Sequence, residues 1–206
     1  MSDSAVPTID LFDRGSKGLQ HHGLRRANER AVLTVVGFNP GLSNAEIARM
    51  SGLAPQTVSA ILNDIEAAGL IVRGEVLRGR RGQPATPIFL NPDGGYSIGI
   101  EVGWRHADVV AIDLHAQIVA HRHIDYVEAD FALLPEQLAG LIAEITSDWP
   151  AARRERLTDI GVGMPGTIHH AAWPLDAGPG SKDGPTPADF ARELESRTGL
   201  LVTILN

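Results

Sequence analysis

Five small or polar residues between positions 56 and 63 have the types and spacing needed to contact the base edges of DNA. They are Gln56, Thr57, Ser59, Ala60 and Asn63. On a helix they share one face, because the apolar residues of the segment recur at i, i+3, i+4 and i+7 on the other face. Those apolar residues are Val58, Ile61, Leu62 and Ile65. Neutral amide and hydroxyl groups can form hydrogen bonds with bases in a major groove, so we predict that this face reads a duplex.

Two arginines, Arg80 and Arg81, lie in a basic, glycine-rich tip between short apolar runs at residues 70–72 and 88–90. Apolar runs joined by such a tip are typical of a β-hairpin. Guanidinium groups at the tip can lie along phosphates or enter a narrow minor groove, where the negative potential is strongest. We therefore predict that Arg80 and Arg81 bind DNA beside the reading helix.

Two helices joined by a tight turn are predicted to position the reading face. Ser43 and Glu46 have the spacing of a capping box at the start of the first helix, and Gly52 can adopt the left-handed conformation that ends it. Pro55 suits the first turn of the second helix, which Gly69 ends. Such a pair also occurs in ordinary helical bundles, but the basic hairpin that follows it favours a winged helix that binds DNA.

A longer helix is predicted before this pair, from Leu19 to Phe38, because apolar residues recur there at helical spacing. Arg25 and Arg26 lie on its polar face. They could contact phosphates, or they could belong to an ordinary solvated helix surface, and the pattern is consistent with both.

The charge is unevenly distributed along the chain. The net charge is −7, but residues 19–90 carry eight Lys and Arg against five Asp and Glu, whereas residues 91–206 carry eight against seventeen. The local basic excess keeps nucleic acid open as a partner. The absence of cysteine suits a reducing cytoplasm and excludes disulfides. With no apolar run of the roughly 20 residues that span a bilayer and no secretion signal, we expect a cytoplasmic protein without a membrane partner.

A second unit is predicted after the linker-like sequence NPDGG at residues 91–95. Three strands at 96–102, 108–114 and 118–124 form an antiparallel meander in this prediction. A helix at 135–149, a strand at 157–164, a long loop at 167–186, a helix at 187–197 and a strand at 200–205 complete it. The predicted organisation is therefore a flexible leader at 1–18, a winged helix at 19–90 and an α/β unit at 91–206.

Histidines form the other group of residues that could bind a ligand. His121 and His123 are two apart on a predicted strand and could share a metal with His106, but an exposed strand face explains them as well. The pair His169 and His170 has the same status. We predict no metal site. No nucleophile-elbow pattern brings Ser, His and Asp together, so a hydrolase has no support.

Five motifs in this order resemble the ROK family, specifically its repressor branch, from about Gly15 to Asn206. They are RRANERAVL, LSNAEIARMSGLAPQTVSAILNDIEAAGLI, GRRGQP, LNPDGGYSIGIEVG and GVGMPGTI. The resemblance implies a winged helix followed by the first lobe of an actin-like, ribonuclease H-like sugar-kinase fold. It also implies a transcriptional regulator, usually a repressor, whose homodimer binds a double-stranded DNA operator and responds to a sugar or sugar derivative.

The chain departs from the kinases of this family at the phosphate loop. Where they have Asp-x-Gly-Gly-Thr, this sequence reads Glu101-Val102-Gly103-Trp104-Arg105, with an indole at a glycine position. Small residues let backbone N–H groups approach phosphate, so ATP binding looks lost. The resemblance places the catalytic Asp directly after Asn206, and Leu205 stands where a Glu often precedes that Asn. We therefore expect no catalytic residue, no cofactor and no enzymatic activity.

The ROK resemblance also implies a sugar site that this chain would share with a second lobe. Its candidate ligand residues here are Gly163, Pro165, Gly166 and Asn206, although the local spacing of the first three, taken alone, favours a simple turn. The chain looks truncated after the first lobe, so we expect weak or no effector binding. We also expect the strand at 200–205 to be an exposed edge that promotes aggregation or domain swapping. The alternatives to a regulator are a ROK sugar kinase and a degraded fragment without a specific function.

Overall fold

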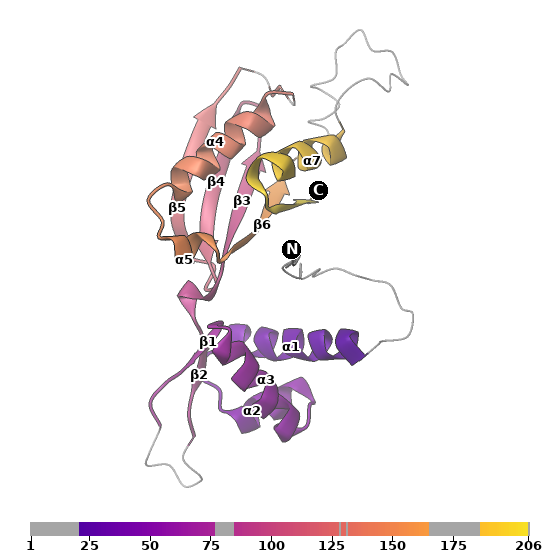
Figure 1. The fold of residues 1–206 in the computed structure, drawn as a ribbon, viewed down its shortest axis with the longest axis vertical. Coiled ribbons are helices and arrows are strands. Elements are labelled where there is room, and N and C mark those ends of the chain that lie inside the picture. Colours follow the sequence, from indigo (N-terminus) through magenta and orange to yellow (C-terminus); the bar gives the residue numbers. More distant parts are fainter. Residues whose placement is uncertain (1–20, 77–84, 128, 131, 165–185, 206) are drawn as a thin grey trace, which may run out of the picture.

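The computed structural model describes residues 21–76, 85–127, 129–130, 132–164 and 186–205 (Figure 1). The N-terminal elements are α1 (His21–Phe38), α2 (Asn44–Ser51), α3 (Pro55–Ala67), β1 (Ile71–Arg73) and β2 (Ile88–Leu90). A short 3₁₀ turn, η1 (Pro92–Gly94), leads to β3 (Tyr96–Val102), β4 (His106–Asp113) and β5 (Ile118–Asp125). The remaining elements are α4 (Leu134–Thr146), α5 (Ala151–Arg154), β6 (Leu157–Gly163), α7 (Pro187–Thr198) and β7 (Leu201–Leu205).

The first five elements form a winged helix around one apolar core. Ser43 and Glu46 form the predicted capping box at the start of α2, and Gly52 ends it with φ +71°. Strands β1 and β2 pair antiparallel, with Ile71 opposite Leu90, and an isolated bridge joins Leu42 to β2. The buried core draws on all three helices and both strands: Val32, Val36, Ile47, Ala48, Val58, Ile61, Leu62, Ile65, Ile71 and Ile88. The predicted winged helix is therefore confirmed.

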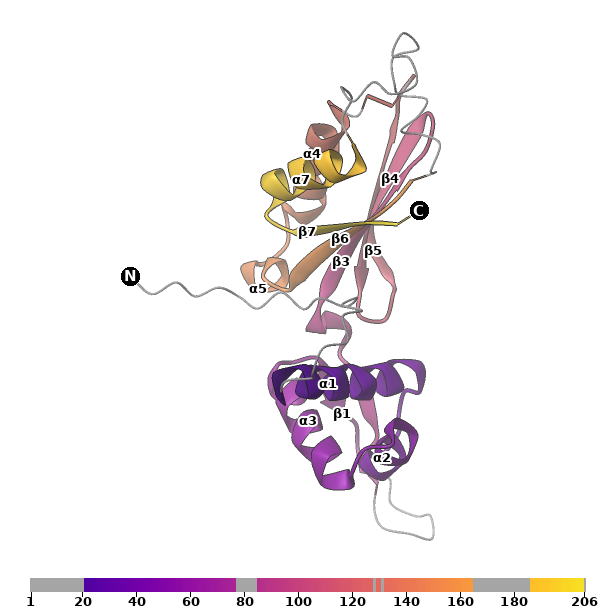
Figure 2. The same cartoon turned by 90° about the vertical axis from the view of Figure 1, so that its right-hand side faces the viewer.

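The remaining strands form one mixed sheet in the order β5-β4-β3-β6-β7. The β3–β4 and β4–β5 pairs are antiparallel, as the predicted meander requires, whereas β3–β6 and β6–β7 are parallel. Helices α4 and α7 lie on one side of this sheet (Figure 2). Alternate residues of β3 and β4, such as Ile98, Ile100 and Val109, are buried against that layer. This arrangement is the predicted α/β fold, with helices on a mixed sheet.

The structure corrects some of the predicted element boundaries. The helix predicted at 135–149 ends at Thr146, and the four-residue helix α5, which was not predicted, begins at Ala151. Strand β4 starts at His106, two residues earlier than predicted. Strand β7 lies at the edge of the sheet with Leu201 and Leu205 exposed, as predicted, while α7 packs against it and Val202 is buried.

The segment after β2 is not an extended linker, because η1 packs between the two units. The Asn91 side chain donates a hydrogen bond to the Gly69 carbonyl, with N···O 2.7 Å, and its backbone N–H donates to Leu70 O at 2.9 Å. Arg156 donates to Asp93 O at 3.0 Å. Gly94 is buried, and a Cβ there would lie 2.8 Å from Gly69 O. The C-terminal end of α3 is thus in direct contact with the junction.

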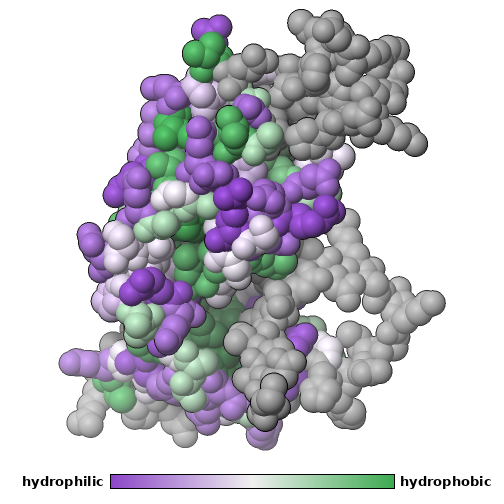
Figure 3. All heavy atoms as spheres, turned by 45° about the horizontal axis from the view of Figure 1, so that its top comes forward, coloured by the Kyte–Doolittle hydropathy of each residue, from purple (hydrophilic) through white to green (hydrophobic). Residues whose placement is uncertain are grey.

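The surface mixes polar and apolar residues. On the face shown in Figure 3, hydrophilic residues in purple are interspersed with hydrophobic ones in green. Among the described residues, no helix combines the length and hydrophobicity needed to span a membrane.

Candidate nucleic-acid interface

Helix α3 presents the predicted reading face to solvent. Gln56, Ala60 and Asn63 are exposed, whereas Thr57 and Ser59 are half-buried. The opposite stripe is buried in the winged-helix core through Val58, Ile61, Leu62 and Ile65. The five residues therefore lie together on the accessible side of one helix, as a DNA-reading face requires, and their contacts with bases stay a prediction.

Ser59 also holds the two helices of the pair together. Its hydroxyl donates to the Pro55 carbonyl at 2.9 Å and accepts a hydrogen bond from the Asn44 side-chain amide at 2.6 Å. Asn44 begins α2, so this contact joins the start of α2 to the first turns of α3. The hydroxyl proton of Ser59 is therefore engaged inside the protein, and its contact with bases stays a prediction. The sequence pattern does not indicate Asn44, because it lies fifteen positions before Ser59 in the chain.

Asn63 is bound by an arginine of the wing. Arg73 in β1 donates through Nη2 to Asn63 Oδ1 at 2.9 Å, and its Nε donates to Glu66 Oε2 at 2.7 Å. One guanidinium therefore connects β1 to two residues one turn apart on α3. With its Oδ1 held in this way, Asn63 presents its amide as a donor, the group that adenine N7 or guanine O6 would accept.

Arg25 connects α1 to the other flank of the reading helix. Its Nη2 lies 2.8 Å from Asp64 Oδ2 and its Nε lies 2.9 Å from Glu29 Oε1. These carboxylates raise the pKa of Arg25 above its ordinary value, chiefly through the hydrogen bond with Glu29. The arginine lies at a shallow cavity of about 280 Å³ between α1 and α3, whose wall includes Thr57 and Ala60. Arg25, whose side chain is 63% exposed, forms an ion pair with α3, and a contact of Arg25 or Arg26 with phosphates stays a prediction.

Several predicted site residues lie outside the described part of the chain. They are Arg80, Arg81, Pro165, Gly166 and Asn206, together with His169 and His170. Gly163, the remaining candidate for the sugar site, ends β6 and is half-buried, where it pairs with Glu101 of β3 and Leu205 of β7.

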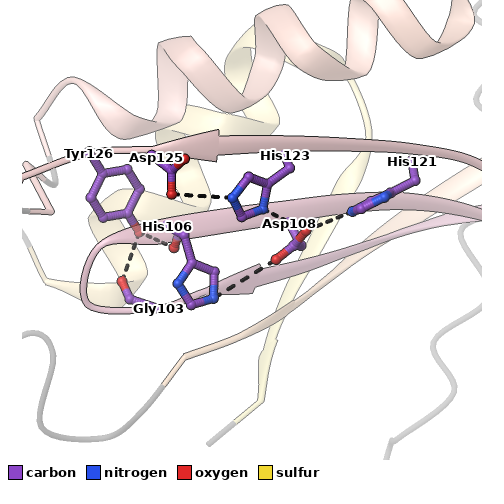
Figure 4. Close-up of polar contacts among 7 residues, drawn as sticks. All are labelled: Gly103, His106, Asp108, His121, His123, Asp125 and Tyr126. Atoms are coloured by element: carbon purple, nitrogen blue, oxygen red, sulfur yellow. Dashed lines mark hydrogen bonds and ion pairs between the residues drawn. The ribbon is translucent and has the colours of Figure 1, made fainter.

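The histidines predicted to share a strand face do come together, around a carboxylate (Figure 4). His121 Nε2 and His123 Nδ1 lie 2.6 and 2.9 Å from the same oxygen, Asp108 Oδ1. His106 stacks on His123 with ring centroids 5.7 Å apart, and Asp125 lies 3.3 Å from His123 Nε2. Within the described residues no group of His, Asp and Glu is arranged to hold a metal ion.

The turn at the position of the kinase phosphate loop is closed by its own chain. Gly103 N–H donates to His106 O at 2.8 Å, and the Tyr126 hydroxyl lies 2.8 Å from Gly103 O and 2.6 Å from His106 O. Burial raises the pKa of Tyr126 to about 12, so this phenol stays protonated and can donate to the turn. The Trp104 side chain at its tip is exposed.

Comparisons with known proteins agree with this architecture. A model of the MarR family matches residues 22–82, the winged-helix segment. The xylose repressor of Bacillus subtilis is 27% identical over 150 residues, which cover 70% of this chain and 38% of the repressor. The N-acetylglucosamine repressor of Shigella flexneri is 26% identical over 145 residues, covering 70% of this chain and 36% of that protein.

A solved structure extends the likeness in fold across both units. The crystal structure of a ROK family transcriptional regulator, described as a homologue of the Escherichia coli MLC protein, superposes with a TM-score of 0.63 at 22% identity. The match covers 89% of this chain and 46% of that one. The chain thus spans less than half the length of the relatives it matches. From the N-terminal winged helix through the five-stranded sheet, the chain shares the fold of that ROK family regulator, and its sequence is similar to those of the xylose and N-acetylglucosamine repressors.

Proposed function

We propose that the chain binds a double-stranded DNA operator and acts as a transcriptional repressor of sugar-related genes. The observation that carries this proposal is the neutral, solvent-exposed face of α3, where Gln56, Ala60 and Asn63 stand on a helix whose other side is fully buried. A helix of this kind can enter a major groove while its apolar stripe stays in the core. The wing predicted to carry Arg80 and Arg81 would lie beside it on the phosphates.

The two domains that we propose correspond to the two apolar cores. Residues 19–90 form the DNA-binding domain, and residues 91–206 form the first lobe of a ROK-like effector domain. In support, each part has its own cluster of buried side chains. Two copies would bind paired half-sites, as dimeric winged-helix regulators do. The site of action is the cytoplasm.

The proposed effector is a sugar or a sugar derivative, because the matched relatives include xylose and N-acetylglucosamine repressors. Gly163, Pro165, Gly166 and Asn206 are the residues proposed to contribute to its site. Phosphoryl transfer is not part of the proposal, since Trp104 replaces a small residue and the turn is closed on itself by Tyr126. Turnover of ATP in the presence of xylose or N-acetylglucosamine would contradict this assignment.

Selection of duplexes from a random-sequence pool tests DNA binding. The retained sequence should contain a repeated half-site, and its affinity should fall log-linearly with salt, because phosphate contacts release counterions. Fluorescence anisotropy over a salt series measures both. Failure of the chain to retain any duplex at low salt would overturn the proposed function.

A further inference from the structure

Helix α3 has an unusual charge for an element that lies in a groove walled by phosphates. Its sequence, PQTVSAILNDIEA, contains Asp64 and Glu66 and no lysine or arginine. Carboxylates that close to phosphates would oppose binding. The structure pairs each of them with an arginine from a neighbouring element, Arg25 from α1 and Arg73 from β1.

The two ion pairs approach α3 from different elements. Arg25 reaches Asp64 from α1, 39 positions away in the sequence. A second carboxylate, Glu29 of the same helix as Arg25, also binds this guanidinium. Arg73 reaches Glu66 from the first wing strand and also binds Asn63. The elements α1 and β1 therefore supply the positive charge that the reading helix lacks.

Folding stability is a weak explanation for these contacts. The Arg25 and Asp64 side chains are 63% and 54% exposed, and exposed ion pairs contribute little to stability in water. Their location matters more. Asp64 follows Asn63 directly and lies one turn beyond Ala60, so its carboxylate adjoins the face proposed to meet DNA.

We propose that Arg25 and Arg73 are positioning residues of the DNA interface, which neutralise Asp64 and Glu66 and thereby permit α3 to enter a phosphate-walled groove. Arg73 has a second task, because it fixes the Asn63 amide with its donor group outward. This inference rests on the proposed function and goes beyond it by assigning roles to residues that contact other protein groups. In the alternative, Arg25 and Arg73 bind phosphates directly, and the Asp64 and Glu66 carboxylates play no part in DNA binding.

A charge-rescue cycle on the full chain separates these two modes. The variants are Arg25→Gln, Asp64→Asn and the double variant, and the probe is a duplex selected from a random pool with the wild-type chain. Arg25→Gln should weaken binding about fivefold, the effect of one unit charge about 4 Å away in water. The double variant should regain wild-type affinity, because Arg25, Glu29 and Asp64 together carry a net −1 in the wild-type chain and Glu29 alone carries −1 in the double variant. A double variant as weak as Arg25→Gln would overturn the inference.

Arg26→Gln is the matched control for this cycle. Arg26 is the next residue of α1, is exposed and forms no ion pair among the described residues. Its replacement removes the same charge, yet adding Asp64→Asn should give no larger gain than in the wild-type background. Rescue of Arg26→Gln to the same extent as Arg25→Gln would mean that only net charge matters, and would overturn the inference.

The second ion pair, Arg73 with Glu66, can be tested through base preference, a property that a change in net charge alone does not alter. Arg73→Gln should weaken binding and flatten base preference, because both Glu66 and Asn63 lose their partner. Adding Glu66→Gln should restore affinity for the selected duplex but not its advantage over single-base-pair variants. Recovery of both, or of neither, would contradict the role given to Arg73.

Circular dichroism and thermal unfolding of each variant show whether a loss of DNA binding is caused by misfolding. We expect a nearly unchanged melting temperature, because exposed ion pairs contribute little to stability. Wild-type chain that retains no duplex would refute the proposed function itself. Wild-type binding with strictly additive effects of Arg25→Gln and Asp64→Asn would refute only the charge-neutralising role.

Discussion

Individual side chains on α3 divide into those that face solvent and those that bind neighbouring elements. Gln56 belongs to the first group, and Ser59 and Asn63 carry contacts to Asn44 and Arg73. The sequence predicted the exposed face correctly because helical periodicity is a local property. The sequence indicated Arg25 only as a possible phosphate contact and did not indicate Arg73 or Asn44, because their contacts join elements that come together only in the folded chain.

Replacement of Gln56 tests base reading at the level of one side chain. Gln56→Ala should cost about 1–3 kcal/mol at a single base pair and relax the preference there, because glutamine forms two hydrogen bonds with adenine in the major groove. Titrations against single-base-pair variants of the selected duplex measure this loss. The matched control is Gln137→Ala, an exposed glutamine of α4, which should leave the profile unchanged. An unaltered base profile for Gln56→Ala would remove this residue from the reading face.

The histidine cluster predicts a pH-dependent contact on the outer sheet surface. The hydrogen bond with Asp108, which has the larger effect, and the one with Asp125 raise the pKa of His123. Hydrogen bonds with the imidazoles of His121 and His123 lower the pKa of Asp108. The stabilisation from His123 is therefore complete below its ordinary pKa of 6.5 and is lost as pH rises through the folded value. The contribution of Asp108 is present above its ordinary 3.8 and is lost as pH falls through its lower folded value.

Asp108→Asn should bring the pKa of His123 down towards 6.5, as followed by NMR titration of the imidazole protons. Other groups facing this cluster are His106 and Glu101, which lies opposite Asp108 on β3. An unchanged His123 titration would mean that the Asp108 contact is not formed in solution.

At the scale of elements, the helices and strands were predictable because their caps and periodicities depend on residues that are close together in the sequence. Capping signals at Ser43, Gly52 and Pro55 placed α2 and α3 correctly. The short helix α5 was missed, since four residues are too few to show a period. The parallel pairing of β3 with β6 does not follow from spacing along the chain, because 54 residues lie between the last residue of β3 and the first of β6.

The contact between α2 and α3 predicts a stability effect separate from DNA reading. Ser59→Ala removes the acceptor of the Asn44 amide, and leaving a half-buried donor without its partner should destabilise the fold by about 1–2 kcal/mol. Thermal unfolding measures this as a lower melting temperature. Ser196→Ala is the control, because that hydroxyl binds only a carbonyl of its own helix. Equal melting temperatures for the two variants would argue against a structural bridge at Ser59.

On the scale of the whole molecule, the two units meet at a packed junction rather than at a loose tether. The glycines of NPDGG predict a linker, but Gly94 is buried against the turn after α3 and the turn between β4 and β5. A Cβ there would lie 2.8 Å from Gly69 O, 2.8 Å from Leu114 Cδ1 and 3.0 Å from Leu70 Cα. Composition alone cannot distinguish a flexible glycine from one required by close packing.

Gly94→Ala should therefore destabilise the junction, at a cost of about 1–3 kcal/mol typical of overpacking. Hydrogen exchange should rise at the backbone N–H groups of Asn91 and Tyr96, which bond across this region. Gly161→Ala in β6 is the matched control, because a Cβ at that position meets no atom within 4 Å. Equal exchange in the two variants would show that the junction is loose in solution.

Because the junction is packed, a rotation at the junction displaces the far end of α3. Its thirteen residues extend roughly 20 Å from the end near Gly69, at the junction, to Pro55. A rotation of the whole winged helix by about 10° at the junction therefore displaces the Pro55 end by roughly 3.5 Å, close to the rise of one base pair. A small rotation of the α/β unit relative to the winged helix is thus enough to shift the Pro55 end of α3 out of register with the base pairs.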